Sequence, residues 1–221
     1  MSDAREAIFQ AIEKAMGPDQ ASSDRIAQEA KALISVPEEM RPAMTYNDPI
    51  QSFINRVSGP KVGASVDLIN DLADLPLTIA GLLKETERPL QVSLQPTAAL
   101  VGLSWADAGI ALTNDPDDQV VVGLARFGIA ETGSLVFHSA ADLPILLNFL
   151  PAVHIVAIRR SAILCHLEDY AKAARAAGDP TPRNACLITG ASGTTDIEGR
   201  LVKGAHGPRD LKVVIVDDVS S

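Results

Sequence analysis

The sequence predicts an α/β fold in which a mainly parallel sheet is covered on both faces, giving a three-layer sandwich. Two observations carry this prediction. Apolar runs rich in β-branched residues, such as 120–125 and 211–216, alternate along the chain with helical patterns, and such continuous apolar strands are typical of buried parallel sheets. In addition, a chain of 221 residues that is 47% hydrophobic can bury the core of one large domain.

The first part of the chain, residues 1–47, predicts a helical extension and a linker ahead of an α/β domain over residues 48–221. Apolar residues recur at helical spacing over 2–16 and 22–35, with a Gly-Pro pair between the two stretches. The segment 35–47 has two prolines and no period, which predicts an extended connection. The helices form either a hairpin packed on the main domain or a partner-binding arm, and their narrow apolar stripes allow both.

The α/β domain is expected to begin with a short helix, because Asp48 can cap it and Pro49 suits its first position. Strands and helices then follow in alternation. The expected strands are 61–66, 90–94, 110–112, 120–125, 135–137, 154–159, 184–189 and 211–216, and the further expected helices are 74–88, 97–105, 144–150 and 161–177.

The charge balance excludes two classes of partner. The net charge is −9 with a pI near 4.9, and no cluster of Lys and Arg provides a surface for nucleic acid or an anionic membrane. The apolar runs are much shorter than the roughly 20 residues of a membrane helix, and the amino terminus lacks a signal-peptide pattern. We therefore expect a soluble cytoplasmic protein.

The two cysteines, Cys165 and Cys186, do not lie at a metal-ligand spacing. Two thiolates cannot supply a four-thiolate iron–sulfur cluster. We expect both to be small buried hydrophobic residues, and we predict no metal site on this chain.

Three polar loops flank apolar runs and predict one site. They are IAETGSLVFHS at 129–139, ITGASGTTDIEG at 188–199 and GAHGP at 204–208. Their glycines and hydroxyls indicate turns, which in open α/β sheets carry the site beyond the carboxyl ends of strands. Such loops bind phosphate or carboxylate through backbone N–H groups, or else are tight structural turns. The dinucleotide and P-loop patterns are both missing.

The same region carries a family resemblance in four motifs. These are GIAETGSLVF at 128–137, LP-x-x-HI-x-x-I at 150–158, TGASGTTDIEG at 189–199 and GAHGPRDLKVVIVD at 204–217. Together they resemble the lactate utilization protein C family, LutC or YkgG, whose members consist of the LUD domain. The amino-terminal half is similar only in its initial helix and an Arg-Pro pair at 41–42.

The resemblance implies a fold similar to the NagB/RpiA/CoA-transferase superfamily and a role in oxidising L-lactate to pyruvate. In that system, cysteine-rich partner subunits carry the iron–sulfur clusters, and the C component is cluster-free. The chain is therefore expected to be an accessory subunit that binds a small carboxylate or phosphate, or its partner subunits. It binds no cofactor of its own in this interpretation.

Lactate oxidation requires a base for the hydroxyl proton and a clamp for the carboxylate. His206 is the candidate base, oriented by Glu131 or Asp196; in the simpler alternative all three are turn or cap residues. We expect His138, His154 and His166 to be structural. The residues expected to bind the substrate or anion are Thr132, Gly133, Ser134, Gly190, Ser192, Gly193, Thr194, Gly207 and Arg209.

The alternative function is a stand-alone enzyme acting on a sugar phosphate or an acyl-CoA, by analogy with the wider superfamily. Glu131 would then be a general base or a carboxylate nucleophile. Against this alternative, the loops lack a lysine placed to neutralise a phosphate, with the exception of Lys203 just before Gly204. A scaffold without a ligand is the third interpretation.

Overall fold

A computed structural model describes residues 2–16, 22–35, 41–114, 120–140, 143–178, 181–195, 198–199 and 201–217. The chain forms two compact units, Met1–Ala43 and Met44–Ser221. The boundary lies four residues before the predicted domain start at Asp48. No described helix combines the length and the hydropathy needed to cross a membrane.

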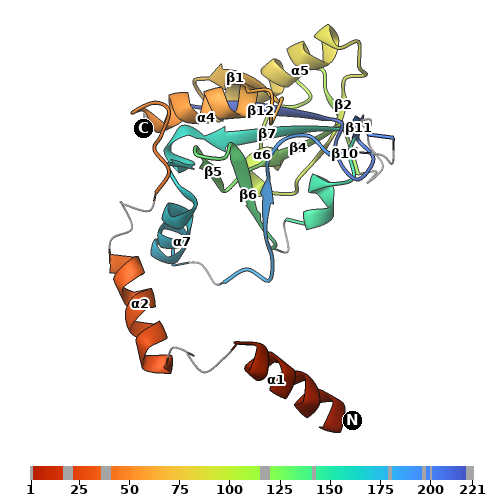
Figure 1. The fold of residues 1–221 in the computed structure, drawn as a ribbon. Coiled ribbons are helices and arrows are strands. Elements are labelled where there is room, and N and C mark those ends of the chain that lie inside the picture. Colours follow the sequence, from red (N-terminus) through yellow and green to blue (C-terminus); the bar gives the residue numbers. More distant parts are fainter. Residues whose placement is uncertain are drawn as a thin grey trace. The chain divides into compact units, whose positions relative to one another are not determined.

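The first unit contains the two predicted helices, α1 (Ser2–Met16) and α2 (Ser23–Ser35) (Figure 1). An ion pair one turn apart, with 2.9 Å between Arg25 Nε and Glu29 Oε1, supports α2. The apolar stripe of α1 remains exposed, and Ile8 and Met16 are 60% and 64% accessible.

The second unit is organised around a six-stranded sheet in which every neighbouring pair is parallel. This confirms the predicted fold class. The strand order is β1-β12-β7-β4-β2-β3. In chain order these strands are β1 (Ser65–Ile69), β2 (Gln91–Leu94), β3 (Ala111–Thr113), β4 (Val120–Leu124), β7 (Val153–Arg159) and β12 (Asp210–Val216).

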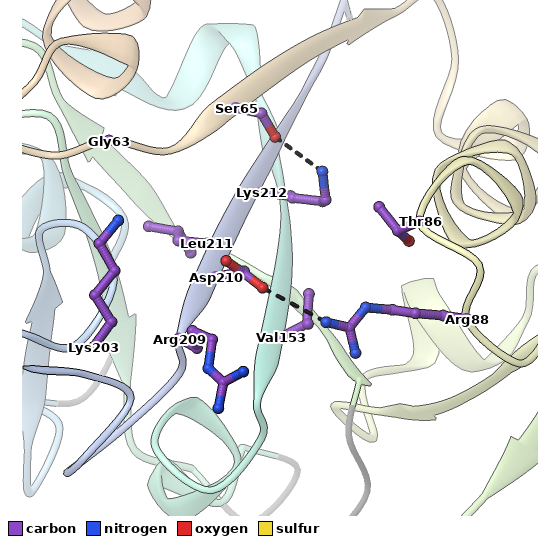
Figure 2. Close-up of a pocket in the computed structure, with 10 residues that line it drawn as sticks. All are labelled: Gly63, Ser65, Thr86, Arg88, Val153, Lys203, Arg209, Asp210, Leu211 and Lys212. Atoms are coloured by element: carbon purple, nitrogen blue, oxygen red, sulfur yellow. Dashed lines mark hydrogen bonds and ion pairs between the residues drawn. The ribbon is translucent and has the colours of Figure 1, made fainter.

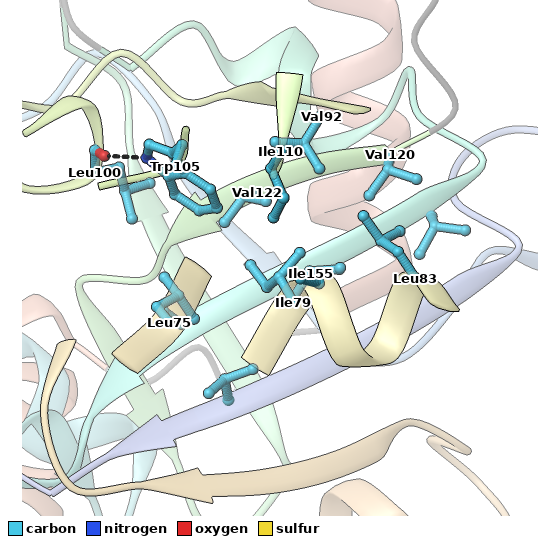
Figure 3. Close-up of a cluster of buried hydrophobic side chains, with 14 of the residues drawn as sticks. Leu75, Ile79, Leu83, Val92, Leu100, Trp105, Ile110, Val120, Val122 and Ile155 are labelled. Carbon is cyan, nitrogen blue, oxygen red and sulfur yellow. Dashed lines mark hydrogen bonds between the residues drawn. The ribbon is translucent and has the colours of Figure 1, made fainter. Parts of the chain in front are cut away.

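One face of this sheet is covered by η1 (Leu72–Asp74), α5 (Leu75–Glu85) and α6 (Ala98–Val101). Leu75, Ile79 and Leu83 of α5 recur at helical spacing and pack on alternate residues of β4 and β7 (Figure 3). The buried indole of Trp105 donates a hydrogen bond to the Leu100 carbonyl at 2.7 Å, which satisfies its one polar group.

The other face is covered by α4 (Pro49–Ser58) and a second, four-stranded sheet. As expected, the Asp48 side chain caps α4 by accepting the Ile50 N–H at 3.0 Å. The second sheet has the order β8-β5-β6-β9. Its strands are β5 (Phe127–Ile129), β6 (Ser134–His138), β8 (Ile163–Leu164) and β9 (Ala185–Ile188).

The helices expected after β6 are shorter than the sequence predicts. The segment predicted at 144–150 is only a 3-10 turn, η2 (Ile145–Asn148). The segment predicted at 161–177 begins with a 3-10 turn, η3 (Arg160–Ala162), and β8, so that α7 covers only Leu167–Ala176. The pairing of β8 with β5 removes these residues from the helix, because a tertiary contact overrides a local preference.

The second predicted loop, 188–199, leads into a strand. Its residues Gly193–Thr195 form β10, which pairs antiparallel with β11 (Leu201–Lys203). In addition, β9 belongs to the second sheet and pairs antiparallel with β6. The loop after β9 therefore does not leave a carboxyl end of the parallel sheet.

Candidate functional site

The turn between β5 and β6 holds the first predicted loop against α4. Gly133 has a φ of +74°, and a Cβ there would lie 2.9 Å from Arg56 Cγ and 3.3 Å from Val57 Cγ2. Only glycine combines this left-handed backbone with such a close approach. The sequence therefore fixes the turn by a steric requirement, and Gly133 has a structural role.

Glu131, the predicted base or orienting carboxylate, lies in the same turn and faces the start of α7. Its Oε1 atom accepts a hydrogen bond from the Leu167 N–H at 2.9 Å, and its own N–H donates to the Cys165 carbonyl at 3.0 Å. A carboxylate at the first residue of a helix satisfies a free N–H group and the positive end of the helix dipole. Glu131 thus serves as a helix cap.

Three hydroxyl groups connect this turn to the second predicted loop. Thr132 Oγ1 lies 2.7 Å from Ser134 Oγ, which lies 2.5 Å from Thr189 Oγ1. The Ser134 side chain is buried, so the chain of hydroxyls supplies its hydrogen bonds. Two of the loops that the sequence predicts as one site therefore meet through side chains.

The second and third loops are joined by backbone hydrogen bonds. The Ser192 N–H donates to the Pro208 carbonyl at 2.7 Å, and the Gly204 N–H donates to the Ser192 carbonyl at 3.0 Å. Gly207 lies against the Ser192 side chain. Gly193 and Thr194 continue this unit into β10.

Gly190 anchors the second loop on the main core. Its φ is +91°, and a Cβ there would lie 2.7 Å from the Val62 carbonyl oxygen. Val62 directly precedes the entry to β1, so Gly190 places the loop beside the amino end of that strand.

His206, the predicted base, is exposed in the bend between β11 and β12. Among the described residues it has neither a hydrogen bond nor an ion pair. Glu131 faces α7 instead, and Asp196 lies outside the described residues. The structure therefore shows no contact between Glu131 and His206, and a three-residue catalytic arrangement stays a prediction.

Lys203, the last residue of β11, and Arg209, the residue before β12, line a pocket of about 270 Å³ (Figure 2). Ser65, Asp210 and Val153, the first residues of β1, β12 and β7, place this pocket at the amino ends of the parallel strands. The lining residues are Gly63, Ser65, Thr86, Arg88, Val153, Lys203, Arg209, Asp210, Leu211 and Lys212.

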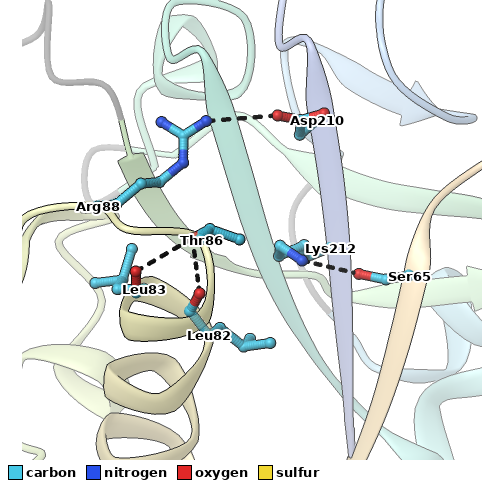
Figure 4. A network of polar contacts seen from close by, with 7 residues as sticks. All are labelled: Ser65, Leu82, Leu83, Thr86, Arg88, Asp210 and Lys212. Carbon is cyan, nitrogen blue, oxygen red and sulfur yellow. Dashed lines mark hydrogen bonds and ion pairs between the residues drawn. The ribbon is translucent and has the colours of Figure 1, made fainter.

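The pocket is positively charged. Four of the described lining residues are cationic and one, Asp210, is acidic. Arg88 Nη2 pairs with Asp210 Oδ2 at 3.6 Å, and Lys212 Nζ donates to Ser65 Oγ at 3.3 Å (Figure 4). Neither Lys203 nor Arg209 has a side-chain hydrogen bond or ion pair to another described residue. Such a local excess of cations is suited to binding an anion.

Sequence reasoning missed the part of the pocket that lies outside the loops. Ser65, Thr86 and Arg88 come from the first half of the domain and belong to no recognisable motif. One sequence feature could have pointed to this pocket. Lys212 is a single cation in the otherwise apolar run 211–216, and such a residue indicates that the amino end of the strand faces a polar space.

Three other histidines have structural surroundings. His154 is fully buried, stacks on Phe137 with 5.7 Å between ring centroids, and has its pKa lowered to about 4 by burial. His138 Nε2 lies 2.8 Å from the Tyr170 hydroxyl; burial, and then the nearby Arg126, lower the pKa of His138. His166 occupies the position just before α7, and its backbone N–H donates to Asp169 Oδ2 at 3.2 Å. Within the described segments, no group of three His, Cys, Asp or Glu residues is placed to hold a metal ion.

Comparison with known proteins agrees with the architecture. Residues 119–216 match the LUD domain family. The chain is 31% identical over 160 residues to the uncharacterized protein YkgG of Escherichia coli, covering 70% of this chain and 68% of that protein. It is 30% identical over 155 residues to lactate utilization protein C of Deinococcus radiodurans, covering 65% and 69% of the two chains.

A solved structure shows the same fold. The crystal structure of a DUF162 family protein from Deinococcus radiodurans superimposes with a TM-score of 0.52 at 23% identity, covering 76% of this chain and 96% of that chain. The sequence matches extend over two thirds of the relatives, and the predicted family resemblance is confirmed. The chain belongs to the LUD domain family, with YkgG and lactate utilization protein C among its relatives.

Proposed function

We propose that this chain is a cytoplasmic, cluster-free component of an L-lactate-oxidising system, and that it binds a small anion in the cationic pocket. Iron–sulfur clusters would be carried by cysteine-rich partner subunits. The name of the relative from Deinococcus radiodurans, lactate utilization protein C, supports the pathway. The cationic residues of the pocket support the proposal that it binds an anion.

The observation that carries the proposal is that the family-matching segment builds most of the pocket. Six of its ten lining residues lie within residues 119–216, Lys203 and Arg209 among them. Because the whole chain has a net charge of −9, a local excess of cations needs a specific arrangement of backbone, which the joined loops provide. Anion binding explains why those loops are held at this edge of the sheet.

The described geometry supports binding better than proton transfer. The Glu131 carboxylate is already used by the Leu167 N–H. His206 has no carboxylate partner among the residues that the structure describes. We therefore assign recognition to this chain and the redox steps to its partners.

The proposed binding role is tested by lactate-dependent growth. Replacing both Lys203 and Arg209 by Gln removes two cations from the exposed wall of the pocket without touching the core. We expect loss of growth on L-lactate with a normal level of the protein. Replacing both Lys172 and Arg175 by Gln, an equal change of charge on α7 outside the pocket, is the control. Full growth of the double variant would contradict the proposal.

The catalytic alternative is tested in the same host with His206→Ala. If this chain only binds, growth on lactate is retained. Loss of growth with a normal protein level would assign chemistry to His206 and overturn the division of labour.

The partner assignment needs a separate experiment. A tagged chain is purified from cells growing on lactate, and iron is measured before and after dissociation of the complex by salt. We expect iron to remain with cysteine-rich chains, because two cysteines cannot ligate a cluster alone. Iron that stays with the isolated chain would refute a cluster-free role.

A further inference from the structure

We infer that the pocket at the amino ends of β1, β12 and β7 takes a small phosphate monoester, and not L-lactate itself. This inference rests on the proposed anion-binding function and names the chemical class of the ligand. Three features carry it: the charge of the pocket, the number of its donors and the elements that supply them, and its size and lining.

The charge exceeds what a monocarboxylate can neutralise. Arg88 is paired with Asp210, which leaves Lys203, Arg209 and Lys212 as three cations without a described acidic partner. A lactate ion would offset one of these charges and leave the others to repel each other. A phosphate monoester carries close to two negative charges at neutral pH, so it matches this pocket more closely.

The cations of the pocket are supplied by different elements. Lys203 extends from the end of β11, Arg209 from the residue before β12, and Lys212 from within β12 beside Ser65 of β1 (Figure 2). Several donors on separate elements suit the terminal oxygens of a tetrahedral phosphate, which offers three strong acceptors. A planar carboxylate is instead typically bound by a single bidentate group.

The size and lining select a small polar ester. A volume of about 270 Å³ corresponds to roughly nine water molecules at about 30 Å³ each, which is more than a lactate ion fills. Val153 and Leu211 are the apolar members of the described lining, and none of its ten residues has an aromatic ring. A nucleotide base would therefore find no stacking partner, whereas the polar carbon chain of a sugar or glycerol phosphate meets hydroxyl groups of Ser65 and Thr86.

Calorimetric titration of the full chain with glycerol 3-phosphate, inorganic phosphate and L-lactate tests this assignment. We expect the ester to bind most tightly, inorganic phosphate less tightly because it leaves part of the pocket unfilled, and lactate at least about tenfold more weakly than the ester, the difference of one charge-assisted hydrogen bond. Tighter binding of inorganic phosphate than of the ester would overturn the assignment to an ester.

Two further measurements test whether these residues hold the ligand. Lys203→Gln and Arg209→Gln should each weaken binding of glycerol 3-phosphate about tenfold, while Lys172→Gln should leave it unchanged. Binding should also weaken between pH 7.5 and pH 5, because the second proton of a phosphate monoester is bound with a pKa of about 6. Circular dichroism of each variant checks that the fold is retained.

The outcomes separate this inference from the proposed function. Lactate binding as tightly as the ester, or pocket variants that lose growth on lactate while the ester does not bind, would overturn the phosphate assignment and leave an anion site in lactate utilization. The opposite result is ester binding that depends on Lys203 and Arg209 while replacing both residues leaves growth on lactate unchanged. It would support the ligand class and overturn the proposed function.

Discussion

The Glu131 carboxylate accepts the backbone N–H of Leu167 at 2.9 Å, although the two residues are 36 positions apart. This bond fastens the turn between β5 and β6 to the first residue of α7. The most conspicuous carboxylate of the loops is thereby used in a structural contact. Its charge stabilises the amino end of a helix.

Glu131→Gln retains an acceptor oxygen and removes only the charge. We expect the free energy of unfolding to fall by about 0.5 kcal/mol, the usual size of an interaction between a charge and a helix end. Glu131→Ala also removes the cap and should cost about 1 kcal/mol. Urea unfolding followed by circular dichroism measures both values. Growth on lactate should survive the Gln change; its loss in a stably folded variant would mean that Glu131 acts in chemistry.

Gly190→Ala is expected to be strongly destabilising. The new Cβ would lie 2.7 Å from the Val62 carbonyl oxygen, in a backbone with a φ of +91°. The left-handed conformation alone costs about 1–2 kcal/mol, and the clash with backbone atoms adds to that cost. Chemical denaturation should show the effect directly.

Gly178→Ala is the matched control for this change. Gly178 has a φ of +68°, but a Cβ there meets nothing within 4 Å. Its cost should be limited to that of the left-handed conformation, about 1–2 kcal/mol. Equal losses at the two positions would show that the contact with Val62 does not restrain the loop.

The buried imidazole of His154 should make stability depend on pH. Its pKa is lowered from 6.5 to about 4 by burial, so below pH 6.5 the unfolded chain binds the proton first. Protonation therefore favours unfolding. The free energy of unfolding keeps its full value above pH 6.5, with respect to this group, and decreases as the pH falls to 4. At about 1.4 kcal/mol per pH unit, the loss approaches 3 kcal/mol.

His154→Leu removes this titration while filling similar apolar space. Between pH 7 and pH 4.5 the variant should lose less stability than the natural chain, and the difference isolates His154 from the carboxylates that titrate in the same range. Urea midpoints at the two pH values provide the comparison. Parallel losses in both proteins would show that His154 does not bind its proton as described.

The parallel sheet was predictable because its strands carry their own signal. Runs such as 120–125 and 211–216 are apolar at nearly every position, which only burial on both faces explains. The second sheet was not predictable in the same way. The pairing of β9 with β6 joins residues about fifty positions apart, and no local pattern encodes such a partner.

The sequence indicated which loops belong together, but it did not indicate at which end of the parallel sheet they lie. The glycine and hydroxyl pattern predicted that the loops 129–139 and 188–199 belong to one site, and the side chains of Ser134 and Thr189 from these two loops are in contact. In open α/β sheets, sites usually lie beyond the carboxyl ends of the strands, and we predicted the site there. The pocket lies instead at the amino ends of the strands. Arg88 was missed because a single cation between a helix and a strand resembles any solvated surface residue.

The position of β12 has a consequence for the order in which the protein is built. This strand lies between β1 and β7, yet the ribosome makes it after every other strand of the sheet. Until it emerges, β1 has no neighbour to bond with, and neither core can close. Nascent chains should therefore remain sensitive to protease until β12 leaves the exit tunnel, and the cationic pocket should be the last feature to mature.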